Sequence, residues 1–126
     1  MIRVRGMSES APVVDWEFAG ESVAQDKELL LELVKTFLGE GPETMDAIRR
    51  AIAAQDAKTL QRAAHTMKGL LRIFGARPAS DAAWKLEEKG RQGDITGTDP
   101  LVADLQEKLD AVIQKLTDYA AGQARL

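Results

Sequence analysis

Apolar residues near the C-terminal end recur at intervals of three and four, the spacing that lines one face of an α-helix. They are Leu101, Leu105, Leu109, Val112 and Leu116. The composition also favours helices, because 44% of the residues are hydrophobic but only 5% are aromatic, which leaves Leu, Ala, Ile, Val and Met to build the interior. With 126 residues the chain has the length of one ordinary domain. We therefore expect an all-α fold, an antiparallel (up-down) four-helix bundle with a short additional N-terminal helix.

Capping residues, glycines and prolines set the expected helix boundaries. The stretch "GEGP", residues 39–42, is expected to break the first long helix, with Pro42 at the first position of the next. Asp56 is a predicted N-cap, Gly75 terminates the helix that follows it, and Pro78 starts another. The predicted helices cover residues 15–23, 26–38, 42 onwards, 56–74, 78–90 and 99 onwards.

The bundle is expected to occupy residues 13–121 as a single domain. Residues 1–12 are expected to be a flexible leader or an added extension, and residues 122–126 a frayed tail. A domain excised from a longer protein would show the same pattern.

Charge and composition argue against several classes of function. The formal net charge of −3 at pH 7 disfavours wholesale nucleic-acid binding. No apolar run approaches the length of a membrane span, and the first residues lack the apolar stretch of a secretory signal. The chain has no cysteine, which excludes disulfides and thiolate chemistry and suits a reducing compartment. We therefore expect a cytoplasmic protein.

The single histidine, His65, falls on the third predicted long segment, opposite the face that points inward. Its neighbours on the helix surface are Arg62, Lys68, Gly69 and Arg72, which make a cationic strip. A lone histidine on a polar face is ordinarily a solvated surface residue. Gly69 argues against that interpretation, because a glycine inside a helix costs about 1 kcal/mol relative to alanine, so a second protein is expected to approach there. The inward stripe consists of Leu60, Ala64, Met67, Leu71 and Phe74.

This face has the groups that a phosphoryl acceptor needs. A neutral imidazole with a free ring nitrogen is a nucleophile near neutral pH, so His65 is the candidate acceptor. Lys68, one turn away, can neutralise phosphoryl oxygens. Phosphoryl transfer is in line and depends on positioning, and the bare backbone at Gly69 leaves space for the donor.

A carboxylate on the next helix is expected to orient the imidazole. If the two helices form a hairpin that turns near residues 75–77, either Glu87 or Glu88 comes level with His65. Such a carboxylate would accept the Nδ1 proton, leave Nε2 free to attack and stabilise the cationic ring. Surface pairing with Lys85, Lys89 or Arg91 is an equally compatible interpretation of both glutamates.

The stretches "AAHTMKGLLRIFGA", residues 63–76, and "LEEKGRQGD", residues 86–94, resemble the histidine-containing phosphotransfer (Hpt) domain of two-component phosphorelays. The resemblance covers roughly residues 13–118. It implies that His65 is phosphorylated, that Lys68 assists at the phosphoryl group and that Gly69 permits a receiver to dock. It also implies that Glu87 hydrogen-bonds the imidazole.

The resemblance further implies a phosphocarrier that is not an enzyme on its own. Its partners would be response-regulator receiver domains and a sensor or hybrid histidine kinase, and the carrier itself would be a monomer. No cofactor or metal is expected, since Mg²⁺ belongs to the receiver in this family. The sequence departs from the usual pattern after Gly69, where small residues are common. The residues expected to contact a partner are Arg62, Leu70, Arg72 and Ile73.

Three other functions fit parts of the pattern. A helical interaction bundle would dock receivers without carrying phosphate, and the phosphoacceptor domain of a chemotaxis-type histidine kinase would share the chemistry but differ in its donor. A carboxylate-rich metal site in a four-helix bundle requires Glu-x-x-His, whereas Gln61 and Arg62 precede His65 and no other histidine exists.

Overall fold

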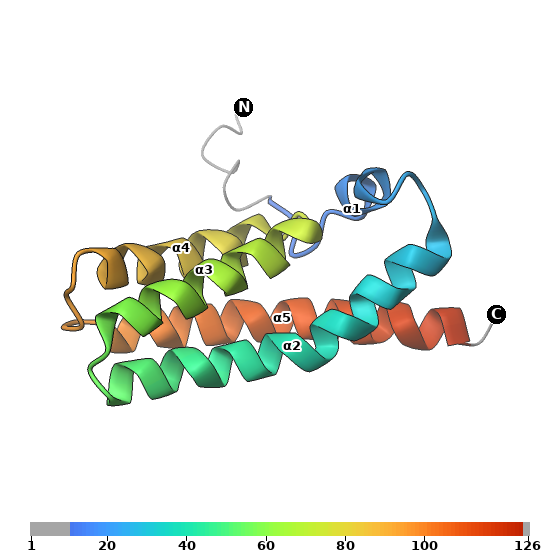
Figure 1. The fold of residues 1–126 in the computed structure, drawn as a ribbon. Helices are drawn as coiled ribbons and strands as arrows, with labels where there is room; N and C mark the ends of the chain where they lie inside the picture. The colour runs from blue at the N-terminus through green and yellow to red at the C-terminus, as the bar shows by residue number, and fades with distance from the viewer. Residues whose placement is uncertain (1–10, 125–126) are drawn as a thin grey trace, which may run out of the picture.

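The computed structural model of the chain describes residues 11–124, and all regular structure in this part is helical. Helices α2 to α5 run up and down in turn and pack in a ring, because α2 contacts α3, α3 contacts α4, α4 contacts α5, and α5 returns to α2 (Figure 1). The short α1 lies at one end. The predicted all-α bundle with a short additional helix is therefore confirmed. The helices are α1 (Trp16–Ser22), α2 (Lys27–Ala53), α3 (Ala57–Ile73), α4 (Arg77–Arg91) and α5 (Asp99–Ala124).

Residues 1–10 and 125–126 lie outside the described residues. They include most of the expected leader and the end of the expected tail. Residues 122–124, the start of the expected tail, belong to helix α5, which ends at Ala124. The expectations for the leader and for the end of the tail stay predictions.

Helix α2 is continuous through "GEGP", so the predicted break at residues 39–42 is wrong. Pro42 lacks an N–H and crowds the carbonyl four residues earlier, at a cost of about 3 kcal/mol, and α2 bends in this region (Figure 1). A continuous helix keeps Phe37, Met45 and Ile48, which lie on either side of the bend, buried in one core. Burying each such side chain contributes about 1.5–3 kcal/mol, which together exceeds the cost of the proline. Gly41 makes room for Phe37, since a Cβ at residue 41 would lie 2.9 Å from the Phe37 ring.

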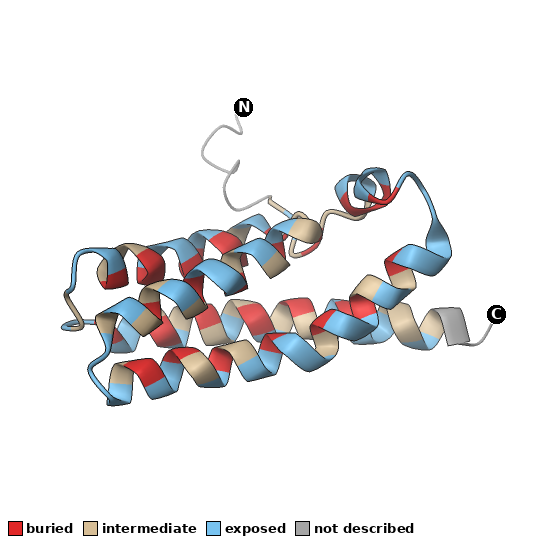
Figure 2. Cartoon of the chain, in the orientation of Figure 1, coloured by how far each residue is buried: buried red, intermediate tan, exposed pale blue. Residues whose placement is uncertain are grey.

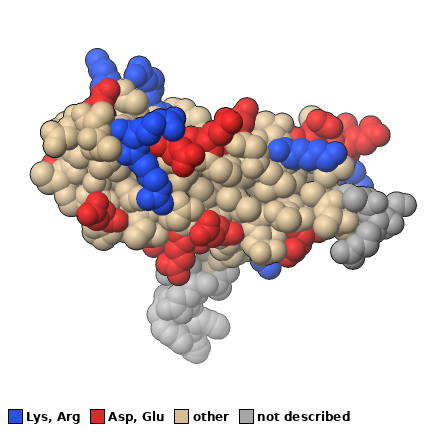
Figure 3. Space-filling view, turned by 90° about the horizontal axis from the view of Figure 1, so that it is seen from below, with Lys and Arg blue, Asp and Glu red and all other residues tan. Residues whose placement is uncertain are grey.

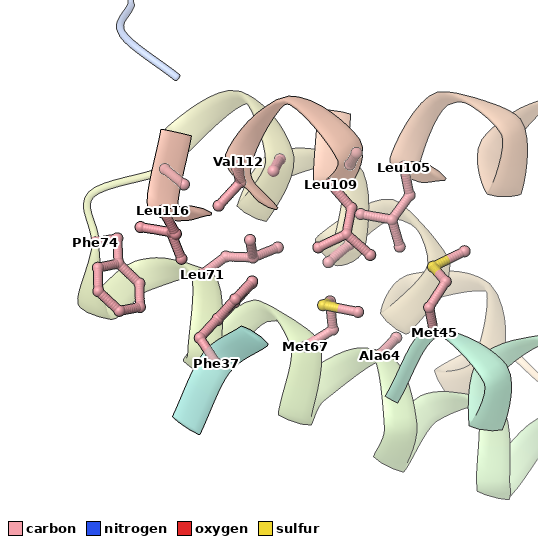
Figure 4. Close-up of a cluster of buried hydrophobic side chains, with 14 of the residues drawn as sticks. Phe37, Met45, Ala64, Met67, Leu71, Phe74, Leu105, Leu109, Val112 and Leu116 are labelled. Carbon is pink, nitrogen blue, oxygen red and sulfur yellow. The ribbon is translucent and has the colours of Figure 1, made fainter. Parts of the chain in front are cut away.

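The core is a continuous apolar stripe along the inner faces of the helices (Figure 2). The stripe predicted for α3 is fully buried, and so is the one predicted for α5, apart from the half-buried Leu101 at its start. Phe37 of α2 meets Phe74 edge to face, with ring centroids 5.6 Å apart. This packing fixes which face of α3 points outward. Figure 4 shows the close contact among Phe37, Met45, Met67, Leu71, Phe74, Leu105, Leu109, Val112 and Leu116.

Helix α1 is fastened to the turn between α3 and α4. The backbone N–H of Asp15 donates to the carbonyl of Phe74 over 2.9 Å, and the Trp16 ring stacks on Tyr119 of α5 at 4.7 Å between centroids. Gly75 adopts the left-handed conformation expected of a helix terminator, with φ +59°. A Cβ there would come within 2.7 Å of the Asp15 Cβ, so the glycine also allows α1 to approach.

The surface formed by α2 and α5 carries charges of both signs. Seen from below Figure 1, basic and acidic side chains alternate with uncharged surface across this face (Figure 3). Among the helices of residues 11–124, none has both the length and the apolar character needed to cross a membrane.

We expect Leu71→Ala to lower the free energy of unfolding by about 2–5 kcal/mol, because Leu71 is fully buried and its removal leaves a cavity in the core. The matched control is Leu29→Ala, since Leu29 is 46% exposed, and its effect should stay within about 0.5 kcal/mol. Urea unfolding followed by circular dichroism measures both. Equal losses in the two variants would contradict the assignment of the buried face of α3.

Candidate functional site

His65 stands near the middle of α3 on the face that points away from the core, as the periodicity predicted. Its side chain is 68% exposed, whereas Ala64 and Met67 on the same helix are buried. The helix begins at a cap: the Asp56 carboxylate accepts hydrogen bonds from the Thr59 hydroxyl and backbone N–H, and these bonds lower the pKa of Asp56. Capping and core packing together present the imidazole to solvent.

Helix α4 crosses α3 at very close range because of Gly90. A Cβ at residue 90 would lie 2.5 Å from the Gln61 backbone nitrogen and 2.8 Å from the Ala57 carbonyl oxygen. Gln61 lies one turn before His65, and Gly90 lies one turn after Glu87. The crossing therefore sets Glu87 beside His65. The sequence alone identifies Gly90 only as the end of a helix; the spacing of three residues between Gly90 and Glu87 is the signal that could have revealed the crossing.

Glu87, and not Glu88, is the glutamate beside His65. The Nδ1 atom of His65 lies 2.9 Å from Oε2 of Glu87. With the carboxylate ionised, Nδ1 carries the proton and donates it in the hydrogen bond, so the neutral ring keeps its lone pair on Nε2. Glu88 forms an ion pair with Arg91 on its own helix. Of the two glutamates that the sequence left as alternatives, Glu87 is therefore the one within hydrogen-bond distance of the imidazole.

Lys68 shares the same carboxylate. Its Nζ lies 2.7 Å from Oε1 of Glu87, and the Lys68 side chain is only 13% exposed. Oε1 is buried and has no other partner among the described residues. Burial raises the pKa of Glu87, but the hydrogen bonds and charges of Lys68 and His65 outweigh it and hold that pKa below its usual value. The lysine expected to point at an incoming phosphoryl group is here bound to Glu87.

The other predicted site residues divide into two groups. Arg62 and Arg72 are exposed on the His65 side of α3, and Gly69 faces open space, with nothing described within 4 Å of where its Cβ would be. Leu70 and Ile73 are half-buried and pack against the core. Within residues 11–124, no group of three His, Asp or Glu side chains is arranged to hold a metal ion.

Residues 32–115 match the family model described as the Hpt domain. None of the curated proteins is significantly similar to the chain in sequence.

Two solved structures share the fold. The first is the histidine-containing phosphotransfer protein B (HptB) from Pseudomonas aeruginosa PAO1, at 23% identity and a TM-score of 0.82, with 89% of this chain and 97% of that one covered. The second is the HPT domain of the Hpt sensor hybrid histidine kinase from Shewanella, at 21% identity and a TM-score of 0.76, with 87% and 95% covered.

We expect Gly90→Ala to lower the free energy of unfolding by about 1–3 kcal/mol, because its Cβ would press on the backbone of α3 and push α4 away. Gly69→Ala is the matched control: it also places alanine inside a helix but meets open space, so it should raise stability by up to about 1 kcal/mol. Urea unfolding measures both. In a ¹⁵N NMR spectrum of the His65 ring, the Nδ1–H tautomer should be less populated in Gly90→Ala than in wild type. Gly69→Ala should match wild type. Retention of tautomer and stability in that variant would contradict the role of the crossing.

Glu87→Gln should lower the free energy of unfolding by roughly 1–3 kcal/mol at pH 7, because it removes the carboxylate that His65 and Lys68 both contact. The pKa of Glu87 is lower in the folded state than its ordinary value of 4.5, so its contribution is fully present above about pH 4.5 and is lost as the pH falls through the lowered pKa. The difference between variant and wild type should therefore shrink below pH 4.5. The control is Glu88→Gln, with an effect within about 1 kcal/mol. A difference that stays constant down to about pH 3 would contradict the lowered pKa.

Proposed function

Because this chain belongs to the Hpt domain family, we propose that it carries phosphoryl groups in a two-component phosphorelay and that His65 is the residue that carries them. One observation supports the assignment above all others. The exposed imidazole is held at Nδ1 by Glu87 over 2.9 Å, which leaves Nε2 as the free nucleophile.

In the proposed reaction the Nε2 lone pair of His65 attacks the phosphorus of a phosphorylated receiver aspartate. The new N–P bond forms as the bond from phosphorus to the aspartate oxygen breaks, and the electron pair leaves with the receiver's carboxylate. The proton on Nδ1 stays in place, so no proton has to move during the step. Reversal of the same step passes the phosphoryl group to the next receiver.

Glu87 stabilises the product of this step. Once Nε2 bears the phosphoryl group, the ring is cationic while Nδ1 remains protonated, and the carboxylate of Glu87 faces that positive charge. Lys68 fixes the carboxylate from its other oxygen at 2.7 Å, which makes it a positioning residue in this proposal. The dianionic phosphoryl group meets Arg62 and Arg72 on the exposed strip, and the missing side chain of Gly69 lets the donor come close.

The domain in this proposal is a carrier and not an enzyme acting alone. The phosphoryl group enters from a receiver aspartate or a histidine kinase and leaves to a receiver domain. The Mg²⁺ that such steps use is placed on the receiver in this proposal, and the carrier supplies the oriented imidazole and the cationic surface.

The test is phosphoryl transfer from a labelled phosphorylated receiver, or from a hybrid kinase with labelled ATP, to wild type and to His65→Gln. We expect label on wild type only, and we expect it to be lost in acid and kept in base, as a phosphoramidate is. Glu87→Gln should accept the label at least about tenfold more slowly, because its ring loses the carboxylate that orients and stabilises it.

The matched control is Glu88→Gln, which should behave as wild type because Glu88 pairs with Arg91. If wild type stayed unlabelled with a broad panel of donors while it remained folded and bound a receiver, the proposal would be wrong, and the face would serve for docking alone.

A further inference from the structure

The large exposed apolar side chains of this domain are not the ones that the sequence nominated for partner contact. Phe18, Leu29 and Trp84 are each 46% exposed. Leu70 and Ile73 are instead half-buried, with part of their surface already used by the core. A partner that approaches His65 therefore finds its main apolar contacts on other elements.

A hollow of about 590 Å³ lies where α1 meets the turn between α3 and α4. Phe18 of α1 lines it, together with Arg72 of α3 and Ser80 and Asp81 of α4. Arg72 is also the last member of the cationic strip that begins at Arg62 and passes His65. The hollow is thus continuous with the surface around the imidazole, and Figure 1 shows α1 beside this end of α3 and α4.

Trp84 connects the hollow to the histidine along α4. It lies three residues after Asp81, which lines the hollow, and three residues before Glu87, which contacts His65. Residues at this spacing are neighbours on a helix surface, so Trp84 lies beside both Asp81 and Glu87 on α4. Two exposed aromatic residues therefore flank a surface that contains the nucleophile, an arginine and a hollow.

We infer that a receiver domain docks across the α3 and α4 side of the bundle, with Trp84 and Phe18 as its two apolar anchors and Arg72 as its charged contact. This inference rests on the proposed function. Tryptophan and arginine are the residues that most often dominate binding energy at interfaces, and the hollow beside Phe18 accepts an apolar side chain of the partner. The aspartyl phosphate of a receiver is anionic, which complements the strip from Arg62 to Arg72.

The test compares phosphoryl transfer to His65 from two donors, a phosphorylated receiver and the small molecule phosphoramidate. Trp84→Ala and Phe18→Ala should each lower kcat/KM for the receiver at least about fivefold, through KM, because they remove docking contacts. Labelling by phosphoramidate should stay within about twofold of wild type, since a small donor does not use the docking surface. Leu29→Ala is the matched control, with the same exposure but on α2, and should leave both reactions unchanged.

A second measurement reports contact without relying on rates. Trp84 becomes the only tryptophan of the chain in Trp16→Phe, so its emission should change when an unphosphorylated receiver is added. Unchanged emission, together with unchanged kcat/KM in both aromatic variants, would overturn the inference, as would a selective loss in Leu29→Ala or Ile73→Ala. If wild type accepted label from neither donor, the proposed function itself would fail and the docking inference with it.

Discussion

The arrangement of the site depends on how closely α4 can approach α3. At Gly90 the two backbones leave no room for a side chain, since a Cβ there would lie 2.5 Å from the Gln61 nitrogen. One turn after Gln61 on α3 and one turn before Gly90 on α4, the same proximity brings a glutamate carboxylate to the imidazole at 2.9 Å. A bulkier residue at the crossing would separate the axes and leave Glu87 without His65, even if every group involved in the chemistry were still present.

The carboxylate of Glu87 shows why that proximity is useful. Burying an ionised carboxylate costs several kcal/mol unless cations or donors offset it. Here Lys68 and His65 take one oxygen each, and their combined effect exceeds that of burial, so the group stays charged at neutral pH. Lys68 thus helps to hold the pKa of the carboxyl below its usual value, and the carboxylate in turn favours the imidazole tautomer that is protonated at Nδ1.

Local sequence patterns predicted the outward position of His65 and a nearby glutamate, but they left three points undecided or wrong. Hairpin register alone could not separate Glu87 from Glu88, because the choice depends on the rotation of α4 about its axis, which the Gly90 contact sets. The break predicted at residues 39–42 was wrong because the buried residues on either side of Pro42 outweighed its local helix-breaking effect. Lys68 was expected on an open strip, and its long side chain instead lies across to α4. Each of these outcomes depends on contacts between helices, which a single segment does not reveal.

The hairpin of α3 and α4 also bears on how the domain folds. His65 and Glu87 are 22 residues apart in the chain, and the turn between their helices spans only residues 74–76. Contacts between residues close in sequence close small loops, which lose little chain entropy and form fast. The His65–Glu87 contact therefore belongs to the local part of the topology, whereas the contact of α5 with α2 closes a much longer stretch of chain. The candidate site of this domain lies within the segment of α3 and α4, residues 57–91, and the rest of the bundle buries the back of that segment.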